Sequence, residues 1–220
     1  MCAQQAAAGY DICINGDGLE IAQTSFACMA ADVPTVMHTL ADLVRQGVQI
    51  YDIVGNHDIA LEHFLAQWGP LRVCPFLNVH TGDYRIRVEH GHLYDPIFAR
   101  MPRLYTALTA AAGVALHVAP KAYALWQKAE STLWRSISPK GGRGEAPHFA
   151  EAADEISRRG FDAVVFGHTH IVNDLQLPSG DRYLNPGSWL NDTTYALLDE
   201  TGPRLLRWEP GTPVGPPPIK

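Results

Sequence analysis

Four short strand-like runs of this chain end abruptly in loops that combine glycine with histidine, asparagine or aspartate. The runs and their loops are Tyr10–Asn15 with Gly16-Asp17-Gly18, Val48–Val54 with Gly55-Asn56-His57-Asp58, Tyr84–Glu89 with His90-Gly91-His92, and Phe161–Phe166 with Gly167-His168-Thr169-His170. Their length and β-branched content predict strands. Because helix-like segments separate the strands, we expect an α/β fold with polar loops at the carboxyl ends of parallel strands.

The helix signals between these strands are specific enough to give boundaries. One helix is predicted to begin after Asp32, with Pro34 in its first turn, and to end at Gly47. Further helices are predicted over Ile59–Trp68 and about Pro147–Arg159. After these, short strands at residues 174–177, 182–184, 195–199 and 204–208 predict an antiparallel sheet, which a disordered tail at 210–220 follows.

Charge is unevenly distributed along the chain. The 220 residues carry 17 basic and 23 acidic side chains, and the net charge of -6 argues against a general nucleic-acid binder. Residues 96–144 are the exception, with seven cations, one anion and helical apolar stripes. We expect this segment to form a helical lid over the polar loops, although packing on the core is the simpler explanation for about half of its aromatic residues.

Targeting and redox signals are missing from the sequence. No run of eighteen apolar residues occurs, the start of the chain lacks the pattern of a signal peptide, and the four cysteines form no C-x-x-C pair. These features predict a cytoplasmic location and thiols that behave as small hydrophobic groups.

The four loops supply six candidate metal-binding or catalytic side chains. They are Asp17, Asn56, His57, His90, His168 and His170. Each one alone is more often structural than catalytic, but their joint occurrence at strand ends favours a common site. Oxygen and imidazole ligands without cysteine suit divalent manganese, zinc or iron. Two such ions, bridged by a carboxylate, activate water and neutralise the oxygens of a phosphoryl group.

The order of these motifs resembles that of the calcineurin-like metallophosphoesterase superfamily, which carries D-x-H, G-D-x-x-D, G-N-H-D/E, a lone histidine and G-H-x-H. The last four correspond here to Gly16–Glu20, with glutamate as the final residue, and to Gly55–Asp58, His90 and Gly167–His170. Asn185-Pro186-Gly187-Ser188 is also similar to the family. The resemblance implies a metallophosphoesterase sandwich with two divalent metals, manganese first and zinc, iron or magnesium as alternatives.

The same resemblance implies a role for each residue. Asp17 would bridge the two metals, Asn56, His90 and His168 would bind one of them, and His170 would bind the other. His57 would contact the phosphate and assist the leaving oxygen, while Asp58 would orient its imidazole. No role is assigned to His92, which stands where relatives often carry aspartate.

The D-x-H motif has no counterpart before Asp17, so the second metal has only Asp17 and His170 from the family set. We expect that the chain as given begins too late in its gene; the alternative is a decayed relative that keeps the fold as a binding scaffold. On the first expectation, residues 1–209 are an N-terminally truncated metallophosphoesterase domain that includes the lid.

The lid is similar in position and character to that of the bacterial UDP-2,3-diacylglucosamine pyrophosphatases. The similarity implies a phosphoester or pyrophosphate hydrolase that acts on a lipid-linked nucleotide sugar, with peripheral contact to the anionic inner membrane. The basic residues expected to bind substrate are Arg100, Arg103, Lys121, Lys128 and Arg135. A soluble nucleotide phosphodiesterase or phosphatase and a catalytically impaired scaffold are the alternatives, and no nucleic-acid partner is expected.

Overall fold

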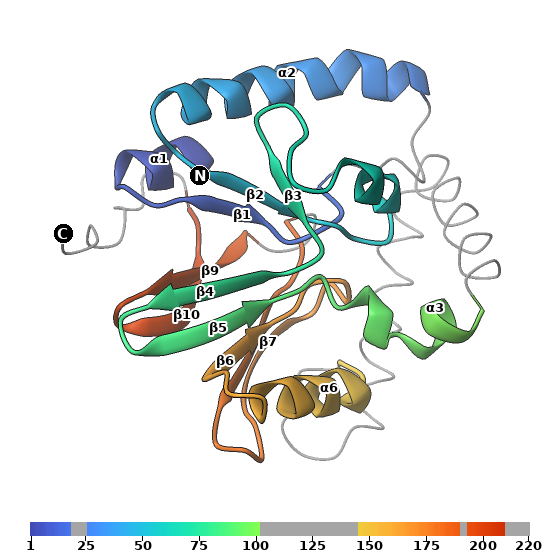
Figure 1. Cartoon of the computed structure of the whole chain (residues 1–220), viewed down its shortest axis with the longest axis vertical. Helices are drawn as coiled ribbons and strands as arrows, with labels where there is room; N and C mark the ends of the chain where they lie inside the picture. Colours follow the sequence, from blue (N-terminus) through green and yellow to red (C-terminus); the bar gives the residue numbers. More distant parts are fainter. Residues whose placement is uncertain (19–25, 102–144, 190–192, 210–220) are drawn as a thin grey trace.

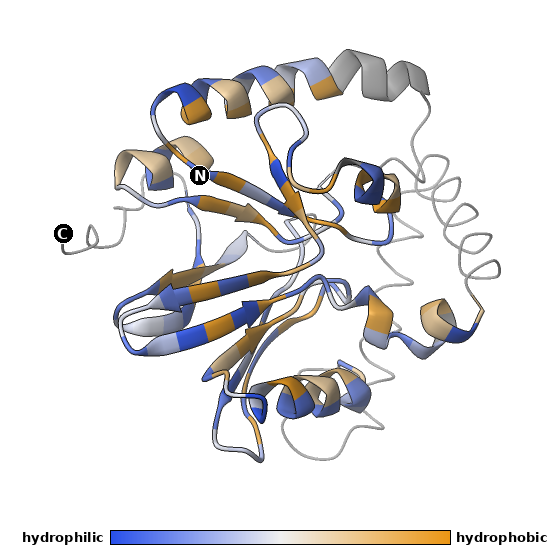
Figure 2. Cartoon of the chain, in the orientation of Figure 1, coloured by the Kyte–Doolittle hydropathy of each residue, from blue (hydrophilic) through white to orange (hydrophobic). Residues whose placement is uncertain are grey.

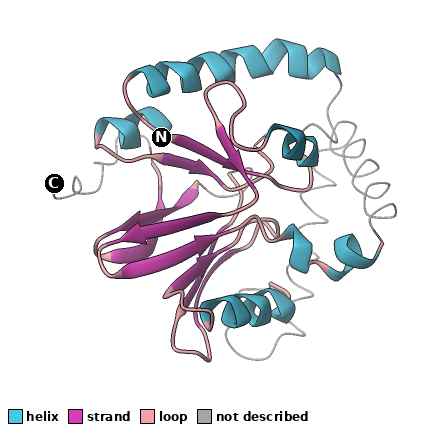
Figure 3. Ribbon diagram, in the orientation of Figure 1, coloured by secondary structure: helices cyan, strands magenta, loops and turns pink. Residues whose placement is uncertain are grey.

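The structure of the chain is a computed structural model that describes residues 1–18, 26–101, 145–189 and 193–209. Two β-sheets face each other in the middle of the molecule, and helices cover their outer sides (Figure 1; Figure 3). This is the α/β sandwich that the sequence predicts. The predicted lid lies outside the described residues except for its start, which contains helix α3 (Pro96–Arg100).

The first sheet is parallel and has three strands. Its order is β1 (Ile12–Ile14), β2 (Ile50–Ile53) and β3 (Arg72–Cys74). Helices α1 (Cys2–Ala7) and α2 (Phe26–Arg45) lie on its outer side (Figure 1). Leu40 and Leu43 of α2 are buried in one cluster with Ile50 of β2. Burial of each such side chain contributes about 1.5 to 3 kcal/mol, which fixes the helix against the strands.

The second sheet is mixed and has five strands. Its order is β4 (Leu77–Thr81), β5 (Tyr84–Val88), β6 (Ala163–Val165), β8 (Arg182–Pro186) and β7 (Val172–Gln176). The three middle strands are parallel, and the two edge strands are antiparallel to their neighbours. Helix α6 (Pro147–Ser157) covers the outer face, while β9 (Thr194–Asp199) and β10 (Gly202–Arg207) form a separate antiparallel pair.

An apolar core between the two sheets holds the sandwich together. Ile53 of the first sheet is completely buried with Ile86, Val165 and Leu184 of the second. Along β4 and β5 hydrophobic and hydrophilic residues alternate, as expected for strands with one buried face (Figure 2). Because the sheets are fixed face to face, the loops that follow β1, β2, β5 and β6 open at one edge, near the 3₁₀ helices η1 (Ile59–Phe64) and η2 (His92–Tyr94).

The prediction that a helix begins after Asp32 is wrong. Helix α2 begins at Phe26, and Pro34 therefore lies inside it. Residues 26–31 include three alanines, and alanine is the strongest helix former. The helix propensity of these residues outweighs the loss of the one backbone hydrogen bond that proline cannot donate, and Pro34 itself lies at an exposed position of the helix.

Two other boundaries also differ from the predictions. The helix expected over Ile59–Trp68 is only the short η1, because the Ala66 N–H donates to Val73 O at 3.0 Å and the chain turns into β3. The C-terminal strands do not form one antiparallel sheet. Instead β7 and β8 extend the five-stranded sheet, with β8 parallel to β6.

Asp52 in β2 is a buried carboxyl group below the loops. It is 1% exposed, and its Oδ1 has no hydrogen-bond partner among the described residues. Burial, with smaller contributions from nearby Asp58 and Asp17, raises its pKa from 3.8 to about 7. The neutral carboxyl group contributes to folding stability. This contribution is fully present below 3.8, the pKa in the unfolded state, and is lost as the pH rises to about 7.

We predict that Asp52→Asn raises the free energy of unfolding of the metal-free protein at pH 8.5 by about 2 to 4 kcal/mol, since one pKa unit corresponds to about 1.4 kcal/mol. At pH 4 the same substitution should change stability little. Urea unfolding in the presence of EDTA measures both values, and Asp42→Asn, at an exposed position of α2, is the control. Equal effects of Asp52→Asn at the two pH values would contradict the prediction.

Candidate metal centre

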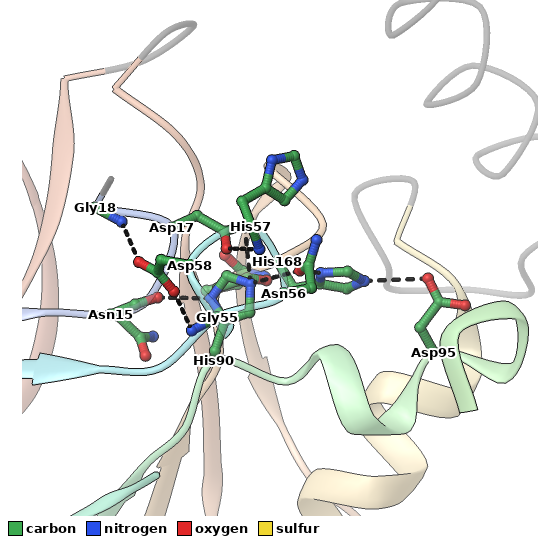
Figure 4. Close-up of polar contacts among 12 residues, drawn as sticks. Asn15, Asp17, Gly18, Gly55, Asn56, His57, Asp58, His90, Asp95 and His168 are labelled. Atoms are coloured by element: carbon green, nitrogen blue, oxygen red, sulfur yellow. Dashed lines mark hydrogen bonds and ion pairs between the residues drawn. The ribbon is translucent and has the colours of Figure 1, made fainter. Parts of the chain in front are cut away.

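Loops from both sheets place polar side chains at one edge of the sandwich (Figure 4). Asp17 follows β1, Asn56 follows β2, His90 follows β5 and His168 follows β6. The potential ligand atoms of Asp17, His90 and His168 all lie within 4.8 Å of one another. The fold therefore brings together residues that the sequence singled out in separate loops.

Acceptor atoms within this group point toward a common position. His90 Nε2 lies 3.1 Å from Asn56 Oδ1 and 3.1 Å from Asp17 Oδ2. His168 Nδ1 lies 2.9 Å from the same Asn56 oxygen. Atoms that share a divalent ion at the usual metal–ligand distances lie about 3 to 3.5 Å from one another. The four atoms thus fit the coordination of one divalent ion.

Each of the two imidazoles is oriented through its other nitrogen. His90 Nδ1 lies 2.7 Å from Asn15 O, and His168 Nε2 lies 3.1 Å from Asp95 Oδ2. In a neutral imidazole these contacts place the proton on the outer nitrogen, which donates it to oxygen. The lone pair is then on the nitrogen that faces the other acceptors, as in metal sites whose histidines are held by a carbonyl or carboxylate.

The electrostatics of the group favours the protonation states that bind metals. Burial lowers the pKa of His168 and lowers that of His170 to about 4, so both rings are neutral at pH 7. Burial acts to raise the pKa of Asp17, but hydrogen bonding to His90 and the positive charge that His90 and His57 carry when protonated hold it well below its ordinary value. An anion and neutral imidazoles are the forms that metal binding requires.

Two glycines of the motifs allow the loops to approach this closely. A Cβ at Gly55 would lie 2.1 Å from Asp17 Oδ1, which accepts a hydrogen bond of 2.9 Å from the His57 N–H. A Cβ at Gly16, whose φ is +78°, would lie 2.2 Å from His90 Nδ1. The side chains of the site thus occupy the space that larger residues would need.

Asp58 ties the loops of the first sheet together. It is completely buried, and its two oxygens accept hydrogen bonds from the Gly55 N–H at 2.7 Å and the Gly18 N–H at 3.1 Å. The imidazole of His57 projects away from the acceptor group (Figure 4). The catalytic roles of His57 and Asp58 remain predictions. In addition to its predicted role, Asp58 fixes the backbone of two loops by accepting these hydrogen bonds.

His92 packs beside the two imidazoles of the group. It is 6% exposed, with its ring centroid 5.4 Å from that of His90 and 4.9 Å, edge-on, from that of Phe98. Burial, with smaller contributions from nearby His90 and His168, lowers its pKa to about 3. His92 is thus a neutral aromatic packing partner. His170 lies outside the group of three residues defined by the 4.8 Å distance, and its predicted role at a second metal remains a prediction.

The sequence analysis missed Asn15 and Asp95. Asn15 acts through its backbone carbonyl, so its side chain carries no signal for this role. Asp95 does carry a sequence signal, because it is an acidic residue that closely follows His90-Gly91-His92 and directly precedes the basic segment at 96–144.

The family described as calcineurin-like phosphoesterase matches residues 4–172. The chain belongs to this family. Among curated relatives, the UDP-2,3-diacylglucosamine hydrolase of Porphyromonas gingivalis (strain ATCC BAA-308 / W83) is 26% identical over 186 residues, which cover 74% of this chain and 70% of that protein.

Solved structures similar to this phosphoesterase-family chain include two Vps29 proteins. Vacuolar protein sorting 29 from Cryptosporidium parvum is 15% identical with a TM-score of 0.36, over 81% of this chain and 58% of that one, so the chain spans less than two thirds of its length. A single mutant of Vps29 from Entamoeba histolytica is 12% identical with a TM-score of 0.39, over 93% of this chain and 87% of that one.

The basic residues expected to bind substrate are mostly outside the described part of the structure. Arg100 is exposed at the end of α3, whereas Arg103, Lys121, Lys128 and Arg135 lie outside the described residues. Among the helices that the structure describes, none is both long and apolar enough to cross a membrane.

We predict that Gly55→Ala lowers the affinity for Mn²⁺ at least tenfold, because the new methyl group must displace the Asp17 carboxylate. Gly47→Ala is the control, since a Cβ at Gly47 meets nothing within 4 Å although φ is +94°. The control should lose about 1 kcal/mol of stability and retain metal affinity. Calorimetric titration and thermal unfolding separate the two effects, and unchanged affinity in Gly55→Ala would show that the loop adapts.

Proposed function

We propose that this member of the phosphoesterase family hydrolyses phosphoesters or pyrophosphates with the help of divalent metal ions. The observation that supports the proposal is the convergence of the four acceptor atoms from Asp17, Asn56, His90 and His168. Two imidazole nitrogens, an amide oxygen and a carboxylate oxygen form a ligand set that suits divalent ions such as manganese and zinc.

In this proposal Asp17, Asn56, His90 and His168 hold one metal, and Asp17 and His170 contribute to a second. Divalent ions there supply positive charge that polarises a phosphoryl oxygen and makes water more acidic. His57, on the loop after β2, contacts the phosphate and gives a proton to the leaving oxygen. Manganese is the metal that we propose first, with zinc, iron or magnesium as alternatives. Because the second metal has two residues from this set, we expect it to bind more weakly.

We predict opposite effects from substitutions at two neighbouring residues. His57→Ala should lower the turnover of bis-p-nitrophenyl phosphate by about 10² to 10⁴ with the metal content nearly unchanged, because the residue acts on the substrate. Asn56→Ala should first lose metal, because its oxygen belongs to the acceptor group. Turnover and bound manganese are measured on the same samples.

The exposed His63 of η1 provides the matched control, and His63→Ala should change neither quantity. Equal losses of metal and turnover in His57→Ala would assign that residue to the metal instead. Bound manganese without any turnover in the unaltered chain would favour the binding-scaffold alternative.

We further propose that the substrate is a lipid-linked nucleotide sugar such as UDP-2,3-diacylglucosamine, met at the surface of the inner membrane. Two observations support this choice. The curated relative from Porphyromonas gingivalis is described as a hydrolase of that compound. Residues 96–144 also combine seven cations and one anion with apolar stripes, a composition that suits a diphosphate with acyl chains and an anionic lipid surface.

We predict that the joint substitution of Lys121, Lys128 and Arg135 by glutamine weakens binding to anionic vesicles and lowers turnover of UDP-2,3-diacylglucosamine, since each exposed cation near such a surface contributes about 1 kcal/mol. Turnover of bis-p-nitrophenyl phosphate should stay unchanged and serves as the control. If the triple variant keeps both vesicle binding and diacylated-substrate turnover, a soluble nucleotide substrate is favoured.

A further inference from the structure

Glu145 is a buried carboxylate directly behind the Gly167–His170 turn. It is 3% exposed and accepts four side-chain hydrogen bonds, all from neutral groups. The donors are Thr169 Oγ1 at 2.6 Å, Tyr183 OH at 2.9 Å, Asn185 Nδ2 at 2.9 Å and Asn173 Nδ2 at 2.9 Å. Three of these partners are themselves 0 to 1% exposed, so the carboxylate is enclosed by protein.

This network holds the turn at several points. Thr169, which donates to Glu145, stands between His168 and His170 in the sequence. Asn185 Nδ2 also lies 2.8 Å from Gly167 O and 2.9 Å from Thr169 Oγ1, so the same amide contacts both the carboxylate and the turn. Displacement of Glu145 would therefore remove the hydrogen bond that Thr169 donates and would leave the turn held to β8 by the Asn185 amide alone among these side chains.

The turn needs such support because its backbone is strained. His168 has a φ of 60° and His170 a φ of 58°, values in the left-handed region that residues other than glycine rarely adopt. Such conformations cost on the order of 1 to 3 kcal/mol each and persist only where the surroundings determine them. Without the network, relaxation of the backbone at His168 would turn its imidazole away from Asp17 and Asn56.

Burial of the Glu145 carboxylate in this space also costs free energy. Burial raises the pKa of Glu145, and its four hydrogen bonds act in the opposite direction. Apolar side chains of similar volume are often as stabilising as buried charged groups or more so. The arrangement of acceptor oxygens opposite four donors is instead suited to fixing one conformation.

We propose that Glu145 is a positioning residue that holds the strained Gly167–His170 turn in its metal-binding conformation, through Thr169 and Asn185. The inference rests on the proposed metal centre. It adds a residue from outside the motifs, two positions before the start of α6, to the groups on which metal affinity depends.

The test compares cobalt and manganese binding in the full chain and its Glu145→Gln variant. In the variant an amide nitrogen must face at least one of the four donors, so the network cannot form completely. We expect affinity for Mn²⁺ to fall 10- to 100-fold and the visible absorption spectrum of bound Co²⁺ to change, as for other groups that orient metal ligands. The Co²⁺ spectrum depends on the geometry of the metal ligands. A variant that only loses folding stability keeps this geometry and therefore the wild-type spectrum.

Asp154→Asn, in the helix α6 that follows Glu145, is the matched control. Asp154 is 9% exposed and accepts a hydrogen bond of 2.8 Å from the Ser179 N–H, without a role at the turn. This control should lose stability but keep wild-type affinity and spectrum. If Glu145→Gln matches the control in affinity and spectrum, the positioning role is wrong.

Thr169→Val provides a second route if Glu145→Gln does not fold, since it removes one hydroxyl at constant volume. We expect a smaller loss of Mn²⁺ affinity, and a combined loss in the double variant with Glu145→Gln that is smaller than the sum of the two, because both residues belong to the same hydrogen-bond network. Wild-type affinity in Thr169→Val would overturn the proposed connection. Lack of metal binding by the unaltered chain would instead overturn the proposed function and, with it, this inference.

Discussion

The apolar contact between the two sheets is the constraint on which the metal centre depends. Asp17 and Asn56 follow strands of one sheet, whereas His90 and His168 follow strands of the other. The packing of Ile53 in one buried cluster with residues of β5, β6 and β8 holds the two sheets together and with them these two pairs, which lie within hydrogen-bond distance of each other. The hydrophobic core therefore sets the separation of the ligands, and small changes in its volume would be felt at the site.

The buried carboxyl groups at this edge of the sandwich differ in their protonation states. Asp17, Asp52 and Asp58 approach one another beneath the loops, and the pKa of Asp17 is lowered while that of Asp52 is raised. The difference follows from their partners, because Asp17 faces His90 whereas Asp52 faces carboxylates. One carboxylate is thereby kept ionised toward the acceptor group, and its neighbour remains neutral over much of the acidic range.

The parts of the fold that could be predicted from the sequence are those with a local signal. Buried parallel strands such as β1, β2 and β6 are apolar runs stopped by polar loops, and they lie where predicted. The strands β3 and β4 were missed, because polar and charged residues interrupt their apolar positions and their pairing partners define them. The start of α2 was misjudged because a proline was given more weight than the alanines before it.

The same distinction applies to the site. Asp17, His90 and His168 carry motif signals, whereas Asn15, Asp95 and Glu145 act on them through contacts that only the folded chain creates. Asp95 and Glu145 hold adjacent residues of one turn, His168 and Thr169. The segment between positions 95 and 145 thus has both of its ends attached to that turn. Insertions, deletions or substitutions between these two attachment points can therefore be accommodated without moving the imidazole of His168 away from Asn56.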